Sequence, residues 1–153
     1  AALLTATGQR SVLELGSYIG YTTLWLADVL QRSGGGSLIS VEIDPMRHKV
    51  VAGLLRGRYT DVDIELVNDD ALSAIDTLDD HSIGFAWVDD DHQPAHVAAE
   101  LKALRPKMKA GGLICMHDVS GPLGLDTVCR AFDGYVLHFP LLGVAGGLGI
   151  IQL

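Results

Sequence analysis

Basic residues are scarce in this sequence, with 11 lysines and arginines against 19 aspartates and glutamates, which gives a formal net charge of −8. Nucleic acids and anionic membrane surfaces are bound through basic faces, so this balance argues against both as partners. The sequence also lacks an apolar run long enough to span a bilayer, and it lacks a visible signal peptide. These absences exclude classes of partner, but the charge identifies no partner by itself.

Cysteine is scarce as well, because only Cys115 and Cys129 are present, and both lie among apolar residues. We therefore expect buried, reduced thiols in a cytoplasmic protein. No internal repeat or low-complexity linker interrupts the 153 residues, of which 48% are hydrophobic, so we predict a single domain over residues 1–153. The chain begins with Ala1-Ala2 and not with methionine, as a processed or trimmed form would.

Short apolar runs alternate with stretches of helical periodicity along the whole chain. This alternation predicts an α/β fold with a doubly wound, mostly parallel, seven-stranded sheet. The link at Gly143–Gly149 is short enough for a hairpin, so we expect the last strand to run antiparallel to its neighbour. The predicted strands are 11–15, 37–43, 63–67, 83–88, 113–116, 135–139 and 148–152. The predicted helices are 1–8, 18–32, 45–55, 71–78, 94–105 and 125–132.

Apolar side chains at helical spacing predict which face of a helix packs on the sheet. In the helix at 18–32 they are Tyr21, Leu24, Trp25, Val29 and Leu30. In the helix at 45–55 they are Met46, Val50, Val51, Leu54 and Leu55. Trp25 and Trp87 are predicted to belong to the core.

A glycine turn joins the first strand to the first long helix. The strand Val12–Leu15 is followed by Gly16 and Gly20, and glycine permits positive φ and close approach of a ligand to the backbone. A dinucleotide-binding turn reads G-x-G-x-x-G, whereas this one reads E-x-G-x-x-x-G, with Glu14 at the strand end. A carboxylate there repels phosphate and suits a cationic ligand. Tyr18 and Ile19 lie within the turn and are expected to wall the ligand; the alternative is a turn used only for packing.

Acidic residues follow the next two strands. Glu42 is placed to accept hydrogen bonds from both hydroxyls of a ribose, with Ile43 beside it; the alternative is a solvated acid at a strand end. After the third strand come Asp69, Asp70 and Ala71. Asp69 and Asp70 also suit the N-cap of a helix, and the two roles are compatible.

The densest polar clusters are Val88-Asp-Asp-Asp-His-Gln93 and Met116-His-Asp118, each at the carboxyl end of a strand. Open α/β sheets place their sites at those ends. Three successive acids are electrostatically costly unless a cation compensates them, and a divalent metal ion would do so. Asp89 and Asp118 come from adjacent strands and could bind one ion from two sides. The alternative is that these are capping residues and solvated turn acids.

The four motifs E-L-G-S-Y-I-G-Y, V-E-I-D-P, V-D-x-D-H and H-D, in this order, resemble the class I S-adenosylmethionine-dependent methyltransferases, whose fold is Rossmann-like. The resemblance is closer to metal-dependent small-molecule O-methyltransferases of the macrocin type than to the catechol type, which has lysine at the His92 position. It implies Asp89, His117 and Asp118 as metal ligands and His92 as the general base. It implies S-adenosylmethionine contacts at Glu14, Gly16, Ser17, Tyr18, Gly20, Glu42, Ile43, Asp69, Asp70, Ala71 and Asp89.

His117 departs from the pattern, because the relatives place aspartate or glutamate there. Imidazole is a poorer ligand than carboxylate for Mg²⁺, so the metal, Mg²⁺ or Mn²⁺ by resemblance, could also be Fe²⁺ or Zn²⁺. His117 could equally serve only to orient Asp118. His48, His81 and His96 have no partner spacing and are expected to be exposed, whereas His138 could approach the site or be structural.

The resemblance implies methyl transfer to a hydroxyl oxygen of a small-molecule acceptor, with a divalent metal lowering the pKa of the hydroxyl and His92 removing its proton. Two alternatives stay open: a module that binds S-adenosylmethionine or S-adenosylhomocysteine without turnover, and an NAD-dependent oxidoreductase. Glu14 and the missing second glycine argue against the oxidoreductase. Short connections leave the site open or completed by another subunit, so a homo-oligomer is an expectation.

Overall fold

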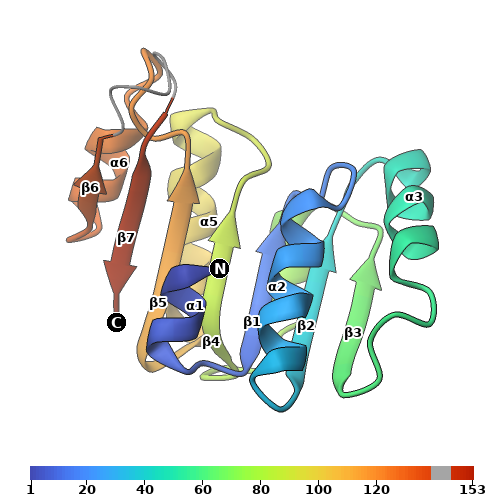
Figure 1. Ribbon diagram of the computed structural model, residues 1–153. Coiled ribbons are helices and arrows are strands. Elements are labelled where there is room, and N and C mark those ends of the chain that lie inside the picture. Colours follow the sequence, from blue (N-terminus) through green and yellow to red (C-terminus); the bar gives the residue numbers. More distant parts are fainter. Residues whose placement is uncertain (139–145) are drawn as a thin grey trace.

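The computed structural model describes residues 1–138 and 146–153, and within these residues seven strands form one sheet (Figure 1). The strands are β1 (Ser11–Leu15), β2 (Gly36–Val41), β3 (Val62–Val67), β4 (Ile83–Val88), β5 (Met108–His117), β6 (Tyr135–Leu137) and β7 (Leu148–Gln152). The helices are α1 (Ala2–Thr7), α2 (Tyr21–Arg32), α3 (Pro45–Leu55), α4 (Ala71–Asp76), α5 (Pro94–Lys107) and α6 (Leu125–Ala131). No helix in these ranges combines the length and the apolar character that crossing a bilayer requires.

The strand order is β3-β2-β1-β4-β5-β7-β6, with β1 to β5 parallel and β7 antiparallel to both β5 and β6. The predicted fold class is therefore confirmed: a doubly wound, mostly parallel α/β sheet that closes with antiparallel strands. The reversal of chain order between β2 and β4 on either side of β1 creates a switch point, where open sheets of this type place their sites.

Two hydrophobic clusters cover the two faces of the sheet. Alternate residues of β4 and β5 contribute to opposite clusters, because successive side chains of a strand point to opposite faces: Phe85 packs with α1 and α2, whereas Ala86 packs with α4, α5 and α6. Figure 1 shows α2 in front of the sheet and α5 behind it. This burial on both faces explains why the parallel strands read as continuous apolar runs in the sequence.

The exposed face of α2 differs from the prediction. Tyr21 is 71% exposed and Trp25 is 45% exposed, and their rings meet edge to face on the outside of the helix. The face that packs on the sheet contains Thr23, Leu26, Ala27, Val29 and Leu30. The prediction that Trp25 lies in the core is wrong. Two apolar stripes fit the helical period here, and only the packing against the sheet selects one of them.

The helix α3 differs in the same way. Val51 and Leu55 are buried as predicted, whereas Met46, Val50 and Leu54 are exposed. The helix lies at the β3 edge of the sheet (Figure 1), where it covers little surface. Its predicted N-cap is confirmed, because the Asp44 carboxylate accepts hydrogen bonds from the backbone N–H groups that begin the helix.

Several predicted boundaries shift by a few residues. The helix α2 begins at Tyr21 because residues 18–20 belong to the glycine turn, and β2 ends at Val41. The strand β5 begins at Met108, five residues before the predicted start at residue 113, and its pairing with β4 contains a register shift. Residue 139 of the predicted strand 135–139 and residues 143–145 of the predicted glycine-rich link lie outside the described residues. Cys115 and Cys129 are unpaired and buried, as predicted.

Candidate functional site

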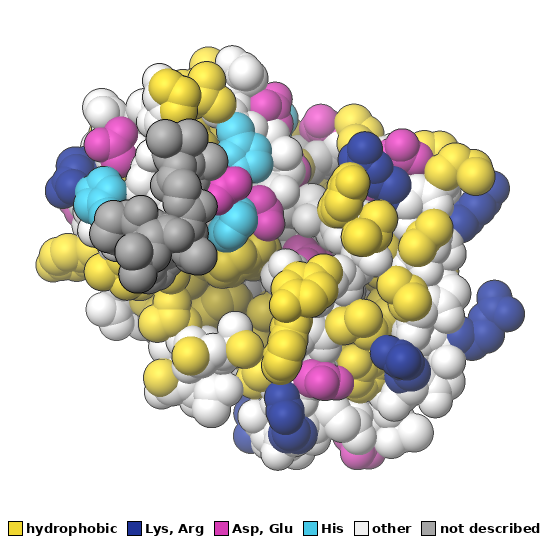
Figure 2. Space-filling model, turned by 45° about the horizontal axis from the view of Figure 1, so that its top comes forward, with side chains coloured by type: hydrophobic (Ala, Val, Ile, Leu, Met, Phe, Trp, Pro, Cys, Tyr) yellow, Lys and Arg dark blue, Asp and Glu magenta, His cyan; other side chains and the backbone are white. Residues whose placement is uncertain are grey.

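A pocket of about 630 Å³ opens at the carboxyl ends of the parallel strands. Figure 2 looks onto this end of the molecule, where histidine and acidic side chains gather on one side of a hollow and hydrophobic side chains on the other. Of the residues predicted for the site, those that line the pocket are Gly16, Ser17, Tyr18, Glu42, Ile43, Asp69, Asp70, Ala71, Asp89, His117 and Asp118. Glu14, Gly20 and His92 do not line it.

The glycine turn shapes one wall of the pocket. Gly16 has φ 84°, and a Cβ atom there would lie 2.5 Å from the backbone oxygen of Asp89, so only glycine lets the end of β1 pack against the end of β4. Gly20 has φ 87° and begins α2, where it packs on the side chains of Val51 and Leu54. Gly16 therefore shapes the pocket, whereas Gly20 shapes the junction of two helices.

Glu42 is held by the backbone around it. Its Oε2 accepts a hydrogen bond from the N–H of Tyr18 at 2.7 Å, and its Oε1 accepts one from the N–H of Asp44 at 2.9 Å. The residue is only 4% exposed, so the alternative of a solvated acid at the strand end does not describe it. The guanidinium of Arg47 lies 3.9 Å from Oε1 and 4.6 Å from the centre of the Tyr18 ring. Sequence analysis did not single out Arg47, which lines the pocket from α3.

Asp70 has the capping role that the sequence analysis offered as an alternative. Its Oδ1 accepts hydrogen bonds from the N–H groups of Leu72 and Ser73, at 3.0 and 3.2 Å, and so caps α4. The residue also lines the pocket next to Ala71, so capping and a place in the site are both present.

Glu14 lies beneath the pocket and not in its wall. It is fully buried in the centre of the sheet, where its Oε2 accepts hydrogen bonds from the hydroxyl groups of Ser40 and Thr23, at 2.6 and 2.7 Å. Its Oε1 has no hydrogen-bond partner. Burial raises the pKa of Glu14 to about 7, against the opposing effect of those two hydroxyl donors. The structure therefore places this acid where it can act on a ligand only through the floor of the pocket.

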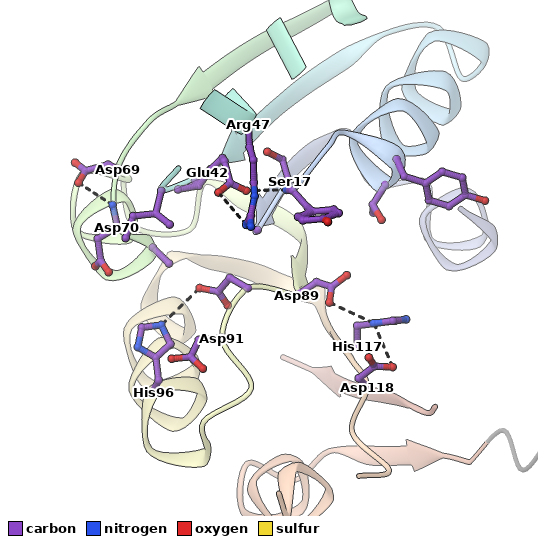
Figure 3. Close-up of a pocket in the computed structure, with 18 residues that line it drawn as sticks. Ser17, Glu42, Arg47, Asp69, Asp70, Asp89, Asp91, His96, His117 and Asp118 are labelled. Carbon is purple, nitrogen blue, oxygen red and sulfur yellow. Dashed lines mark hydrogen bonds and ion pairs between the residues drawn. The ribbon is translucent and has the colours of Figure 1, made fainter. Parts of the chain in front are cut away.

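The two acidic and histidine-containing motifs that follow β4 and β5 come together at the ends of these strands (Figure 3). The Nδ1 atom of His117 lies 3.2 Å from Oδ1 of Asp89 and 3.4 Å from Oδ1 of Asp118. The contact with Asp89 raises the pKa of His117, and partial burial opposes the rise. Trp87 lies beside the pair, with its ring centre 5.8 Å from that of His117. A carboxylate between an imidazole and an indole N–H is thus fixed at the pocket edge.

His92 lies behind Asp89, outside the main pocket. Its Nε2 is 3.8 Å from Oδ1 of Asp89, is buried, and has no hydrogen-bond partner. The ring lines a small adjacent hollow together with Met116 and Leu125. His92, the predicted base, is therefore separated from the pocket by the carboxylate of Asp89.

The donors of this cluster fit a divalent metal ion of intermediate softness. One ligand atom from each of Asp89, His92 and His117 lies within 4.8 Å of the others. Two imidazoles and a carboxylate suit Zn²⁺, Mn²⁺ or Fe²⁺ better than Mg²⁺, which prefers oxygen ligands.

A further cluster was missed by the sequence analysis. His96 was expected to be exposed and without a partner, but its Nε2 lies 3.5 Å from Oδ2 of Asp90 and 3.3 Å from Oε1 of Glu100. The prediction for His96 is wrong, because four-residue spacing on α5 brings it beside Glu100. That spacing was the signal in the sequence that could have revealed the pair. Burial, followed by the nearby Asp90 carboxylate, raises the pKa of Glu100 to about 10.

Comparison with known families gives a match over most of the chain. A family described as "Methyltransferase domain" matches residues 13–119. A search of curated proteins finds no match of significance in sequence.

Solved structures share the fold at low sequence identity. The O-methyltransferase from Bacillus cereus in complex with SAH is 21% identical, with a TM-score of 0.73 over 99% of this chain and 78% of that one. The O-methyltransferase TomG from Streptomyces achromogenes, in complex with SAM, is 20% identical with a TM-score of 0.70 over 99% and 76%. The SAH-bound methyltransferase PaMTH1 from Podospora anserina is 17% identical with a TM-score of 0.77 over 99% and 75%. The likeness shows the class I methyltransferase fold.

Proposed function

Because this chain belongs to the family of methyltransferase domains, we propose that it transfers a methyl group from S-adenosylmethionine to a hydroxyl oxygen of a small-molecule acceptor. One observation carries the proposal: a single pocket has the buried, backbone-anchored Glu42 on one wall and the Asp89–His117 pair on another. The SAM and SAH complexes of the O-methyltransferases from Streptomyces achromogenes and Bacillus cereus support it by likeness of fold.

The pocket residues fit S-adenosylmethionine. A carboxylate that already accepts backbone hydrogen bonds, as Glu42 does, is held rigid and can receive ribose hydroxyls without losing side-chain freedom. Ile43 and Ala71 offer apolar surface for an adenine ring, and the several acids of the lining suit a sulfonium and an ammonium group. The bound cofactor supplies an electrophilic methyl group. This distribution of charge argues against a pyrophosphate ligand and hence against the NAD alternative.

Asp89, His117 and Asp118 are the residues that would hold a divalent metal ion while His92 stays free to act as a base; with His92 as the third ligand in place of Asp118, it could not accept a proton. Such an ion supplies Lewis acidity, which lowers the pKa of an acceptor hydroxyl. The chain itself positions the acceptor at the edge of the pocket and receives its proton. We assign that proton to Nε2 of His92, which has no hydrogen-bond partner and lies 3.8 Å from Oδ1 of Asp89, so that the proton reaches it past that carboxylate.

His117 is the competing base. It lines the pocket, and its contact with Asp89 raises the pKa of the imidazole, which makes the ring a better proton acceptor. His117 can act as the base only if it does not ligate a metal ion. Activity measured after removal of the metal therefore distinguishes His117 from His92 as the base.

The proposal also covers the cellular location and the oligomeric state of the protein. Two buried, unpaired thiols support a cytoplasmic location, where thiols stay reduced. The exposed side chains of Tyr18, Ile19 and Tyr21 near the pocket support a homo-oligomer, in which a second copy would cover them. Light scattering of the purified protein tests that expectation.

The first experiment is a calorimetric titration with S-adenosylhomocysteine, with Mn²⁺ and again in EDTA. We expect micromolar binding in both conditions. We expect Glu42→Gln to weaken binding by roughly 10-fold or more, as the loss of charge-assisted hydrogen bonds does. Glu65→Gln, at an exposed acid of β3, is the matched control and should bind like the wild type. Absence of binding in the wild type under both conditions would overturn the cofactor assignment.

The second experiment tests the acceptor class. The protein is incubated with methyl-labelled S-adenosylmethionine and a panel of hydroxylated small molecules, and the products are analysed by mass spectrometry. Label on an ether oxygen supports the proposal, whereas label only on nitrogen or carbon contradicts it. Loss of the product in EDTA, and its return with Mn²⁺, would support the metal assignment.

A further inference from the structure

The cluster of Asp90, His96 and Glu100 lies on a different side of the pocket from the Asp89–His117 pair. Figure 3 shows His96 projecting from α5 on one side and His117 from the end of β5 on the other. Asp90 and His96 line the pocket, while Glu100 lies behind them on α5. The consecutive residues Asp89 and Asp90 therefore contribute to two separate groups of side chains.

Glu100 is the residue that needs an explanation. It is fully buried, and neither of its carboxylate oxygens has a hydrogen-bond partner. The Oδ1 atom of Asp90 is buried and lacks a partner as well. A buried carboxylate without hydrogen bonds is costly, and such groups are almost always paired, protonated or bound to a metal.

The surroundings increase that cost. Burial is the main cause that disfavours the ionised form of Glu100, and negative charge on Asp90, Asp91 and Asp70 adds to it. Within residues 1–138 and 146–153, His96 is the basic side chain that forms an ion-pair contact with Asp90 or Glu100. A single imidazole carries at most one positive charge and so compensates two or more carboxylates poorly. With Glu100 ionised, this group of side chains is therefore short of positive charge, which either a proton or a metal ion would supply.

The spacing of the three side chains suits a metal ion. One donor atom from each lies within 4.8 Å of the others, and Nε2 of His96 is 3.3 Å from Oε1 of Glu100 and 3.5 Å from Oδ2 of Asp90. Ligands at about 2.1 Å from a tetrahedral ion are separated by about 3.4 Å. Both measured separations agree with that value, and Oε1 of Glu100, which has no hydrogen-bond partner, is an atom that such an ion would satisfy.

We propose that Asp90, His96 and Glu100 form a second divalent-metal site, separate from the Asp89–His117–Asp118 cluster, that takes a transition ion such as Zn²⁺. One imidazole with two carboxylates favours Zn²⁺ over Mg²⁺ or Ca²⁺, which prefer oxygen ligands alone. The proposal does not depend on methyl transfer, because it concerns occupancy of the cluster and not turnover.

The site links two elements that shape the pocket. Asp90 follows β4, whereas His96 and Glu100 lie one turn apart near the start of α5. An ion held by all three fixes the loop 89–93 against the helix. Because Asp90 and His96 line the pocket, a remaining coordination position faces the cavity and is available to water or to an atom of a bound ligand.

The test measures zinc stoichiometry in a protein whose other cluster has been disabled. The background variant carries His92→Ala and His117→Ala, which removes the two imidazoles that lie beside Asp89. After EDTA treatment and desalting, it is titrated with Zn²⁺ by calorimetry, and the bound metal is counted by elemental analysis. We expect one tightly bound ion per chain, and a Tm that rises when Zn²⁺ is added.

Glu100→Gln is then introduced into that background. Glutamine matches the shape of a protonated glutamic acid, so this variant should fold even if the wild-type group carries a proton. Loss of a direct ligand should weaken Zn²⁺ binding by about 100-fold or more, at or beyond the upper end of what altered outer-shell partners cause. His96→Ala should have the same effect, whereas His81→Ala, at an exposed turn histidine, should have none.

Two results would overturn the proposal. If the background variant binds no Zn²⁺, Glu100 is compensated by a proton alone. If Glu100→Gln binds Zn²⁺ as tightly and at the same stoichiometry as the background, the ion lies elsewhere. Circular dichroism and Tm of every variant establish that it is folded, so that loss of binding is not loss of structure.

Discussion

The two halves of the pocket treat their carboxylates differently. Where β1, β2 and β3 end, Glu42, Asp44 and Asp70 each accept hydrogen bonds from backbone N–H groups. Where β4 and β5 end, Asp89, Asp90 and Asp118 face imidazoles instead, and only Asp91 among the described carboxylates there accepts a backbone hydrogen bond. Asp90, and Glu100 on α5 behind it, keep oxygens without a partner. The first half is arranged in advance for a ligand that donates hydrogen bonds, and the second half is arranged for a proton or a cation.

This difference teaches that the number of acids alone says little about a site. Backbone donors satisfy a carboxylate permanently, so it stays ionised and fixed in place. An imidazole compensates a carboxylate only to an extent that depends on whether the ring is protonated and on whether a metal ion is bound. We therefore expect changes in the β4/β5 half to affect chemistry, and changes in the β1/β2 half to affect cofactor binding and stability.

The largest expected effect is on catalysis in the β4/β5 half. His92→Gln should lower kcat by roughly 10²- to 10⁴-fold, the usual contribution of a general base, with little change in affinity for S-adenosylhomocysteine. Steady-state kinetics with an acceptor from the panel measures kcat, and calorimetry measures affinity. His81→Gln is the matched control.

His117→Ala distinguishes the two assignments of the base. If His92→Gln keeps full activity while His117→Ala loses it even in EDTA, the base is His117 and our assignment is wrong. If both variants lose activity and only the wild type responds to added Mn²⁺, His117 acts as a ligand.

The next effect concerns Glu14, buried below the β1/β2 half. Its pKa is raised from 4.5 to about 7 in the folded state, so folding takes up a proton between those values. Stability from this group is therefore fully present below about pH 4.5 and is lost as pH rises toward 7, by up to about 3 kcal/mol. Glu14→Gln, which cannot ionise, should gain that much relative to the wild type between pH 4.5 and pH 8.

Urea denaturation of both proteins at several pH values measures this difference, in which the other titrating groups largely cancel. Glu65→Gln, at an exposed position, should show no such pH-dependent gain. A constant difference between Glu14→Gln and the wild type across the range would contradict the raised pKa.

A smaller effect is expected at Gly16, where the end of β1 packs against the end of β4 and the two halves of the pocket meet. Gly16→Ala forces a side chain into positive φ and against the Asp89 backbone, and should destabilise the protein by about 1–3 kcal/mol while weakening cofactor binding. Gly53→Ala is the comparison, since this glycine lies inside α3 with no atom near its Cβ position. It should stabilise by about 0.5–1 kcal/mol through helix propensity. Equal effects of the two substitutions would show that the β1–β4 junction is not tight.

The smallest effect is at Arg47, which contacts Glu42 and the Tyr18 ring from the surface. Arg47→Met keeps the length of the side chain but loses its charge, and should weaken S-adenosylhomocysteine binding only a few-fold, because exposed ion pairs and cation–π contacts contribute little. Arg56→Met, just beyond α3, serves as the control in the same titration. A loss as large as that of Glu42→Gln would mean that Arg47 contacts the cofactor directly.

Much of the site could be predicted because parallel strands end at a common edge. The motifs after β1, β2, β4 and β5 are separated by tens of residues, yet the topology brings them to one pocket, as predicted for Gly16, Glu42, Asp89 and His117. The motif did not predict how its side chains are oriented. His92 and Asp89 are three residues apart in one motif, but the loop turns the histidine behind the carboxylate.

By itself, the sequence determined the order of strands and helices, the glycine turn and the chemistry of the strand ends, because these depend on local periodicity and on residues with special backbone or ionisation properties. Only the tertiary structure decided which face of α2 is buried, that Glu14 lies below the pocket, and that Asp90 meets His96 and Glu100. The reason is physical. Burial and pairing depend on how elements pack, and neighbouring residues such as Asp89 and Asp90 can point into different surroundings with no change in local sequence.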